Sequence, residues 1–200
     1  SIHSNASAAE RWRELALSSA LDQSGLHLGG ALARQNHRDT ATSLLVCRIV
    51  LRSLMPSMIP SEDIEYIKEL IPREFRSLLP AFLDPREPGT KRREFNRMRT
   101  LLYSYLARND GLSCQLNLGV CDEDSGFDVD HLIPLSSNVL NKALRELKAR
   151  PGKKVLTQAY GSNNPLNLVL ACKRCNAHKK HNFPSVEQLG RILSIRLESG

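Results

Sequence analysis

Four cysteines in the second half of this 200-residue chain constrain its fold more than any other feature. They form two pairs, Cys114 with Cys121 and Cys172 with Cys175, separated by about fifty residues. Two such pairs can converge as thiolates on one tetrahedral Zn²⁺ ion. The Cys172-x-x-Cys175 spacing is typical of a zinc knuckle, whereas the gap between Cys114 and Cys121 is wider than the usual two to four residues.

Disulfides are the alternative use of these cysteines. The first twenty residues carry charged side chains where a secretion signal would be apolar, and no apolar run reaches the roughly 18–20 residues that span a bilayer. We therefore expect a cytoplasmic protein without a membrane segment, a setting in which disulfides are rare. The sequence thus predicts a structural Zn²⁺ that holds a loop-rich region together. Cys47, in an apolar stretch, is expected to be a buried inert thiol.

The positive charge of the chain is concentrated in one segment. Residues 142–181 hold ten Lys and Arg side chains against Glu146, while the whole chain has a net charge of +7. A basic field of this kind attracts a polyanion such as nucleic acid. A run of carboxylates precedes it, and together they suit a metal-dependent nuclease, the alternative being a solvated loop beside an acidic turn. The run consists of Asp122, Glu123, Asp124, Asp128 and Asp130.

Hydrophobic periodicity differs between the two parts of the chain. Residues 1–108 are predicted to be helical, and residues 109–200 have shorter apolar runs. The predicted fold is therefore α+β and mostly helical. Helices are expected over 8–21, 30–55, 61–71 (capped by Ser61), 72–83, 90–108 (capped by Thr90), 172–180 and 185–197, and strands over 128–135 and 166–170.

Polar residues between and after the cysteine pairs suggest a reaction site. Asp130 and His131 are adjacent on a predicted strand, so their side chains point to opposite sides of the backbone. Asn176 opens a predicted helix beside the zinc knuckle, where its amide oxygen can reach the same cation as Asp130. Asn167 is placed to bond backbone groups or the imidazole of His131.

The segments DVDHLIPLS and NPLNLVLACKRCNAHKK resemble the motif of the HNH nuclease family, a ββα-metal finger. The resemblance covers about residues 112–182. It implies that His131 is the general base, that Asp130 is a metal ligand and that Asn167 positions the loop and the base. The last position of the motif, often His, is Asn176 here, as in the Asn-bearing members. His178 and His181 are alternative ligands on the same helix.

The resemblance predicts a metal-dependent endonuclease that hydrolyses DNA, in our expectation double-stranded DNA. Two oxygen ligands, Asp130 and Asn176, suit Mg²⁺ or Mn²⁺ as a catalytic ion separate from the structural zinc. Lys179 or Lys173 would neutralise charge in the transition state, so the candidate catalytic set is His131, Asn167 and Lys179. Side chains expected to bind nucleic acid are Lys153, Lys154, Lys173, Arg174 and Lys180.

Two other functions remain open at this point. One is a zinc-stapled nucleic-acid-binding module that does not cleave, and the other is an RNA-cleaving nuclease of the same fold. A small HNH protein with a helical N-terminal region resembles nuclease subunits of bacterial anti-phage systems, which predicts an ATPase partner by fold-level analogy. A homodimer would supply the two sites needed to cut both strands.

Overall fold

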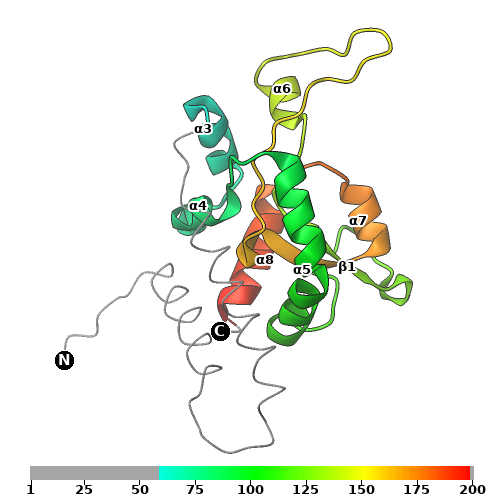
Figure 1. Ribbon diagram of the computed structural model, residues 1–200. Coiled ribbons are helices and arrows are strands. Elements are labelled where there is room, and N and C mark those ends of the chain that lie inside the picture. Colours follow the sequence, from blue (N-terminus) through cyan, green and yellow to red (C-terminus); the bar gives the residue numbers. More distant parts are fainter. Residues whose placement is uncertain (1–58, 199–200) are drawn as a thin grey trace, which may run out of the picture.

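The computed structural model describes residues 59–198 (Figure 1). The helices predicted over 8–21 and 30–55, together with Cys47, lie outside the described residues. Within them the fold is α+β, with about half of the residues in helices and one small sheet of two strands. No helix in this part of the chain is long and apolar enough to cross a membrane.

Two of the helices predicted before the sheet differ from those observed. α3 (Ser61–Glu69) follows Pro60 and has no side-chain cap, so the Ser61 cap is wrong. The segment predicted as one helix over 72–83 is a 3₁₀-helix, η2 (Arg73–Leu78), followed by a short α4 (Leu79–Phe82).

α5 (Pro88–Asn109) is the longest helix that the structure describes. Its N-cap is Glu87 and not the predicted Thr90, because the Glu87 carboxylate accepts from Gly89 N at 2.8 Å and Thr90 N at 2.7 Å. Pro88 fits the first helical position, where an N–H would lack a partner anyway.

The two strands form an antiparallel ribbon. β1 (Phe127–His131) pairs with β2 (Leu168–Cys172), so that His131 lies opposite Leu168 and Phe127 lies opposite Cys172. α7 (Lys173–Lys179) follows β2 directly. The remaining elements are η3 (Glu123–Ser125), α6 (Val139–Ala143), η4 (Pro165–Asn167) and α8 (Val186–Glu198).

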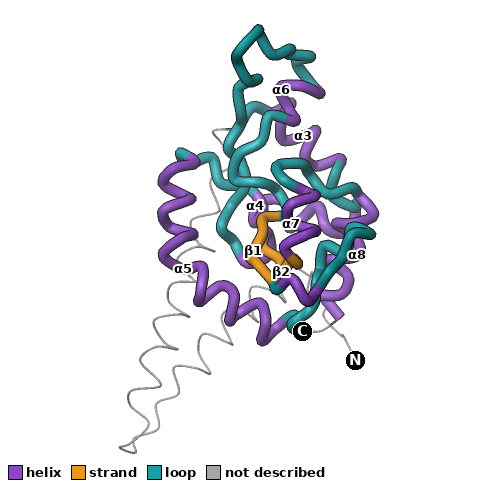
Figure 2. Tube along the Cα trace, turned by 90° about the vertical axis from the view of Figure 1, so that its right-hand side faces the viewer, coloured by secondary structure: helices purple, strands orange, loops and turns teal. Residues whose placement is uncertain are grey.

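Alternation along the strands gives the ribbon two different faces. Val129, Leu168 and Leu170 pack on the apolar stripe of α5, whereas Val169 and Ala171 join the larger core on the opposite face. Figure 2 shows the ribbon between α5 and α7.

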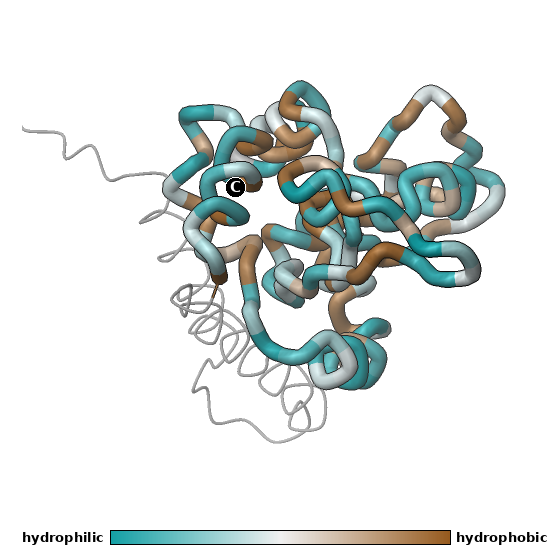
Figure 3. The backbone as a smooth tube through the Cα atoms, turned by 90° about the horizontal axis from the view of Figure 1, so that it is seen from above, coloured by the Kyte–Doolittle hydropathy of each residue, from teal (hydrophilic) through white to brown (hydrophobic). Residues whose placement is uncertain are grey.

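The larger core draws on segments far apart in the sequence, and Figure 3 shows apolar and polar residues interleaved along them. Phe82 from α4, Leu132 after β1 and Leu193 from α8 are all fully buried in it. The predicted domain boundary between residues 108 and 109 therefore falls inside this packing. We use the name arm for residues 144–157, which project from the body beyond α6 (Figures 1 and 2).

Candidate functional site

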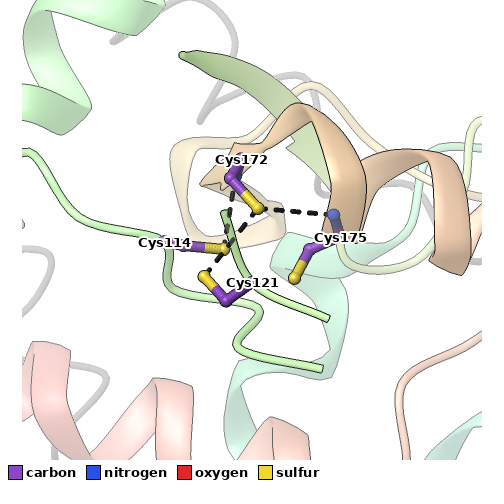
Figure 4. A group of neighbouring side chains, drawn as sticks. All are labelled: Cys114, Cys121, Cys172 and Cys175. Carbon is purple, nitrogen blue, oxygen red and sulfur yellow. Dashed lines mark hydrogen bonds between the residues drawn. The ribbon is translucent and has the colours of Figure 1, made fainter. Parts of the chain in front are cut away.

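The four cysteines come together at one end of the ribbon (Figure 4). Their Sγ atoms all lie within 4.8 Å of one another, and those of Cys121 and Cys172 are 3.8 Å apart. Zn–S bonds of about 2.3 Å in a tetrahedron place sulfurs about 3.8 Å apart. The prediction that all four residues form one cluster able to hold a metal such as zinc is confirmed.

Backbone N–H groups surround the sulfurs of this cluster. Asp122 N and Cys175 N each donate to Cys172 Sγ at 3.4 Å, and Leu118 N donates to Cys175 Sγ at 3.4 Å. Burial alone would raise the pKa of the Cys172 thiol, but the N–H groups of Asp122 and Cys175, together with the thiols of Cys175 and Cys114, lower it to about 7. A thiolate stabilised in this way is the form of cysteine that ligates a metal.

His131 lies at the other end of the ribbon, on the face covered by α5. Its side chain is buried, and its ring centroid is 4.7 Å from that of Phe95. Nε2 is 3.0 Å from Asn163 Oδ1. Burial lowers the pKa of His131 to about 4, the bond to Asn163 opposes this, and the nearby cations Lys179 and Lys91 add to the lowering. The imidazole is therefore neutral at pH 7.

Asp130 faces the opposite side, as predicted, where it meets α7. Its Oδ2 lies 2.9 Å from Lys179 Nζ but is buried without the geometry of a hydrogen bond. Lys179 Nζ instead donates to the backbone oxygen of His131 at 2.7 Å. Because Lys179 is buried beneath both residues, its ammonium holds Asp130 in place, a different position from the phosphate-facing one that the sequence suggested.

Asn167 bonds backbone and not the imidazole. Its Oδ1 accepts from Ile133 N at 2.7 Å, and its Nδ2 donates to Ile133 O at 2.9 Å and Ser162 O at 2.8 Å. It thus holds the chain that leaves β1 just after His131. Asn167 was expected to bond either backbone groups or the imidazole of His131, and in the structure it bonds backbone groups.

Asn163 is the residue that contacts the imidazole, and sequence reasoning missed it. The available signal was the string Asn163-Asn164-Pro165-Leu166-Asn167, which is too polar for a segment just before a fully buried strand. Amides at buried positions have partners, so such a string indicates a hydrogen-bonded turn.

Lys91 stands beside Arg92 and Arg93 on α5, and it is fully buried. Its ammonium donates to Asp84 O at 2.6 Å, Ala159 O at 2.7 Å and Gly161 O at 2.9 Å. This side chain joins α5 to the loop that carries Asn163.

Asn176 is half-buried on α7, three residues before Lys179. Residues three apart share a helix face, so Asn176 lies on the same side of α7 as Lys179. Its side chain makes no hydrogen bond within residues 59–198. His178 and His181 are exposed, and neither joins a group of three metal-ligating side chains in the described part of the chain.

The carboxylates of the acidic run have separate partners. Asp128 pairs with Arg99 at 2.6 Å, Asp122 lies 3.8 Å from Arg174, and the Glu123 carboxylate accepts from Cys114 N at 2.7 Å. These three carboxylates have different partners, and no three carboxylates of the run form a group that could hold a metal among the described residues.

The predicted nucleic-acid-binding residues are all exposed, as phosphate contacts require. They fall into two groups, Lys153 and Lys154 on the arm, and Lys173, Arg174 and Lys180 on α7 and its C-terminal end. The arm turns at Gly152, where a φ of 70° favours glycine and Lys153 N donates to Arg150 O at 2.9 Å.

Comparison of this chain with protein-family models, with curated proteins and with solved structures finds no match. The residues and their geometry therefore carry the functional argument.

Proposed function

We propose that this chain is a metal-dependent endonuclease of the HNH type that hydrolyses phosphodiester bonds of DNA. The single observation that carries the proposal is the placement of Asp130 and His131. They occupy adjacent positions at the end of β1, on opposite faces, beside a helix that begins at the cysteine cluster. The order of strand, strand and helix agrees with the order of motifs that resembles the HNH family.

The residues near Asp130 fit a divalent cation bound through oxygen. Asp130 supplies a buried carboxylate, whose Oδ2 is paired with the Lys179 ammonium without hydrogen-bond geometry, and Asn176 supplies an amide oxygen from the facing helix. Oxygen ligands suit Mg²⁺ and Mn²⁺. Such an ion, when bound, stabilises negative charge on phosphate oxygens as a Lewis acid.

The chain's own residues prepare water for attack on phosphorus. His131 is neutral at pH 7 and can accept a proton from water, while Asn163 holds one ring nitrogen. Lys179 fixes Asp130 from beneath, and Asn167 fixes the backbone of Ile133. Each of these side chains is held by at least one partner, which keeps the arrangement rigid before substrate arrives.

The charge distribution supports a nucleic acid as the substrate. Four exposed cations of the arm, with no ion pair in the described part of the chain, can contact phosphates: Lys148, Arg150, Lys153 and Lys154. Phosphate contacts of this kind supply affinity without sequence readout. A second chain would provide the site for the opposite DNA strand.

The test is nicking of supercoiled plasmid with Mg²⁺ or Mn²⁺. Wild type is expected to cleave, and His131→Ala is expected to lose about 10²-fold or more in rate while still binding DNA. His178→Ala, which changes an exposed histidine on α7, is the matched control and should cleave like wild type. Equal cleavage by wild type and His131→Ala would refute the proposal. Labelled RNA in parallel decides between the two nucleic acids.

A second candidate is a nucleic-acid-binding module that does not cleave. The observation that favours it is the Lys179 ammonium, which already lies 2.9 Å from Asp130 and partly neutralises that carboxylate. This function predicts DNA binding without nicking at any concentration of Mg²⁺ or Mn²⁺.

A further inference from the structure

We propose that Asn163 is a positioning residue that fixes the His131 ring with its proton on Nε2, leaving Nδ1 as the nitrogen that receives a proton from water. The role of Nδ1 rests on the proposed function. The position of the ring proton does not, because it follows from the contacts of Asn163 alone.

The orientation of the Asn163 amide is determined by its surroundings. Nδ2 lies 2.9 Å from the backbone oxygen of Lys91 and 3.5 Å from Glu94 Oε2. Both oxygens accept hydrogen bonds, so the NH₂ group must face them. A flipped amide would place its oxygen against a carbonyl and a carboxylate. Oδ1 therefore faces His131.

The amide orientation then determines the tautomer of His131. Oδ1 can only accept, and it lies 3.0 Å from Nε2, so Nε2 must carry the proton. A neutral imidazole has one donor nitrogen and one acceptor nitrogen. Nδ1 is consequently the acceptor, and it makes no hydrogen bond to the part of the chain that the structure describes.

The backbone on both sides of this contact is held as well. The Lys91 ammonium binds the carbonyl oxygen of Gly161, two residues before Asn163. A Cβ at Gly161 would overlap the carbonyl oxygens of Ile133 and Pro134, so this loop packs directly on the chain that follows His131. Phe95 covers the imidazole from α5. Ring, amide and both backbone segments thus form one fixed unit.

The experiment is ¹H–¹⁵N NMR of the full chain labelled with ¹⁵N-histidine, with His131→Gln used to assign the His131 signals. Wild type is expected to show a slowly exchanging proton on Nε2 and an unprotonated Nδ1. Asn163→Leu, similar in size and without an acceptor, should lose that proton signal. Asn163→Asp keeps an acceptor and loses the bond to Lys91, so it should be less stable yet retain the signal.

Asn141→Leu is the control for general destabilisation. Asn141 is also buried and donates to a carbonyl, that of Leu156 at 2.9 Å, but it does not contact His131. It should lower the melting temperature and leave the Nε2 proton signal unchanged. In the nicking assay, Asn163→Leu should reduce kcat roughly 10²-fold with little change in KM.

A wild-type proton on Nδ1 would overturn the inference, as would an Nε2 proton signal that survives in Asn163→Leu. The expected proton signature without any cleavage would refute the proposed function and still support the assignment of the ring proton. The assignment of the ring proton and the proposed function can therefore be refuted independently.

Discussion

The two ends of the β1–β2 ribbon are stabilised in different ways. At one end Cys172, opposite Phe127, belongs to a cluster of four sulfurs. At the other end His131, opposite Leu168, lies among buried polar side chains. At about 3.4 Å per residue, five-residue strands separate these ends by roughly 14 Å. We call them the sulfur end and the polar end.

The sulfur end offers four ligands to an ion that the chain does not itself supply, whereas the polar end is held by the chain's own side chains. Four thiolates repel one another unless a cation lies between them. At the polar end, Lys91, Asn163 and Asn167 each bind backbone atoms of another segment. The contrast predicts that the two ends respond to different perturbations.

Loss of the metal should have the largest effect. Cys172→Ser, or removal of metal by a chelator, is expected to abolish cooperative unfolding, because structural zinc contributes on the order of 10 kcal/mol in small zinc domains. The measurement is thermal melting by circular dichroism together with metal content. A purified protein without metal that melts at the same temperature as the metal-loaded protein would contradict the comparison.

Removal of the Lys91 ammonium should weaken the polar end alone. Lys91→Met removes the donor from the carbonyls of Asp84, Ala159 and Gly161 and is expected to lower the free energy of unfolding by about 4 kcal/mol. Urea unfolding measures this, and Arg97→Met, at an exposed position of the same helix, is the control. Metal content should stay at the wild-type level. Loss of the metal in Lys91→Met would mean that the two ends are not independent.

Acid should act on the polar end through His131. Its pKa is about 4 in the folded chain and near 6.5 when unfolded, so the unfolded chain binds the proton first. The stabilising contribution is therefore complete above pH 6.5 and falls as the pH is lowered toward 4, by about 3 kcal/mol in total.

The measurement that isolates this effect compares unfolding of wild type and His131→Gln across pH 4–7. The difference between the two free energies of unfolding should change with pH in this range and stay constant above it. A constant difference throughout would show that the imidazole is not buried in its neutral form.

Charge removal on the arm should have the smallest effect on the fold. Lys153→Gln with Lys154→Gln is expected to leave the melting temperature unchanged and to reduce the salt dependence of DNA binding by about two phosphate contacts. Binding measured from 50 to 200 mM salt gives this slope, with Lys68→Gln on α3 as the control. An unchanged slope would remove the arm from the DNA interface.

The sequence predicts the sulfur end better than the polar end. The cysteine spacing and the alternation of Asp130 and His131 are local signals, and both have the predicted geometry. The contacts of Lys91 with Ala159 and Gly161 join residues about seventy positions apart. Beside Arg92 and Arg93, Lys91 looks like any solvated residue, because nothing nearby in sequence indicates which cation of a basic run is enclosed.

The same limit explains the errors in the predicted helix caps and the separate partners of the acidic residues. Glu87 and not Thr90 is the N-cap because Pro88 occupies the first helical position. Threonine is the more usual N-cap residue, so the sequence favours Thr90. The carboxylates of Glu123 and Asp128 have different partners, Cys114 N for Glu123 and Arg99 on α5 for Asp128, and the sequence does not indicate either contact. The sequence predicts which residues are charged, and the fold decides which of them meet.

The packing of α5 over the ribbon has a consequence for any attempt to excise the C-terminal segment as a minimal unit. A fragment that starts at residue 109 would keep all four sulfurs and both Asp130 and His131. It would lose Phe95, which covers the imidazole, and Lys91, whose carbonyl orients Asn163. Such a fragment should keep the four-cysteine site yet hold the histidine ring in no defined direction.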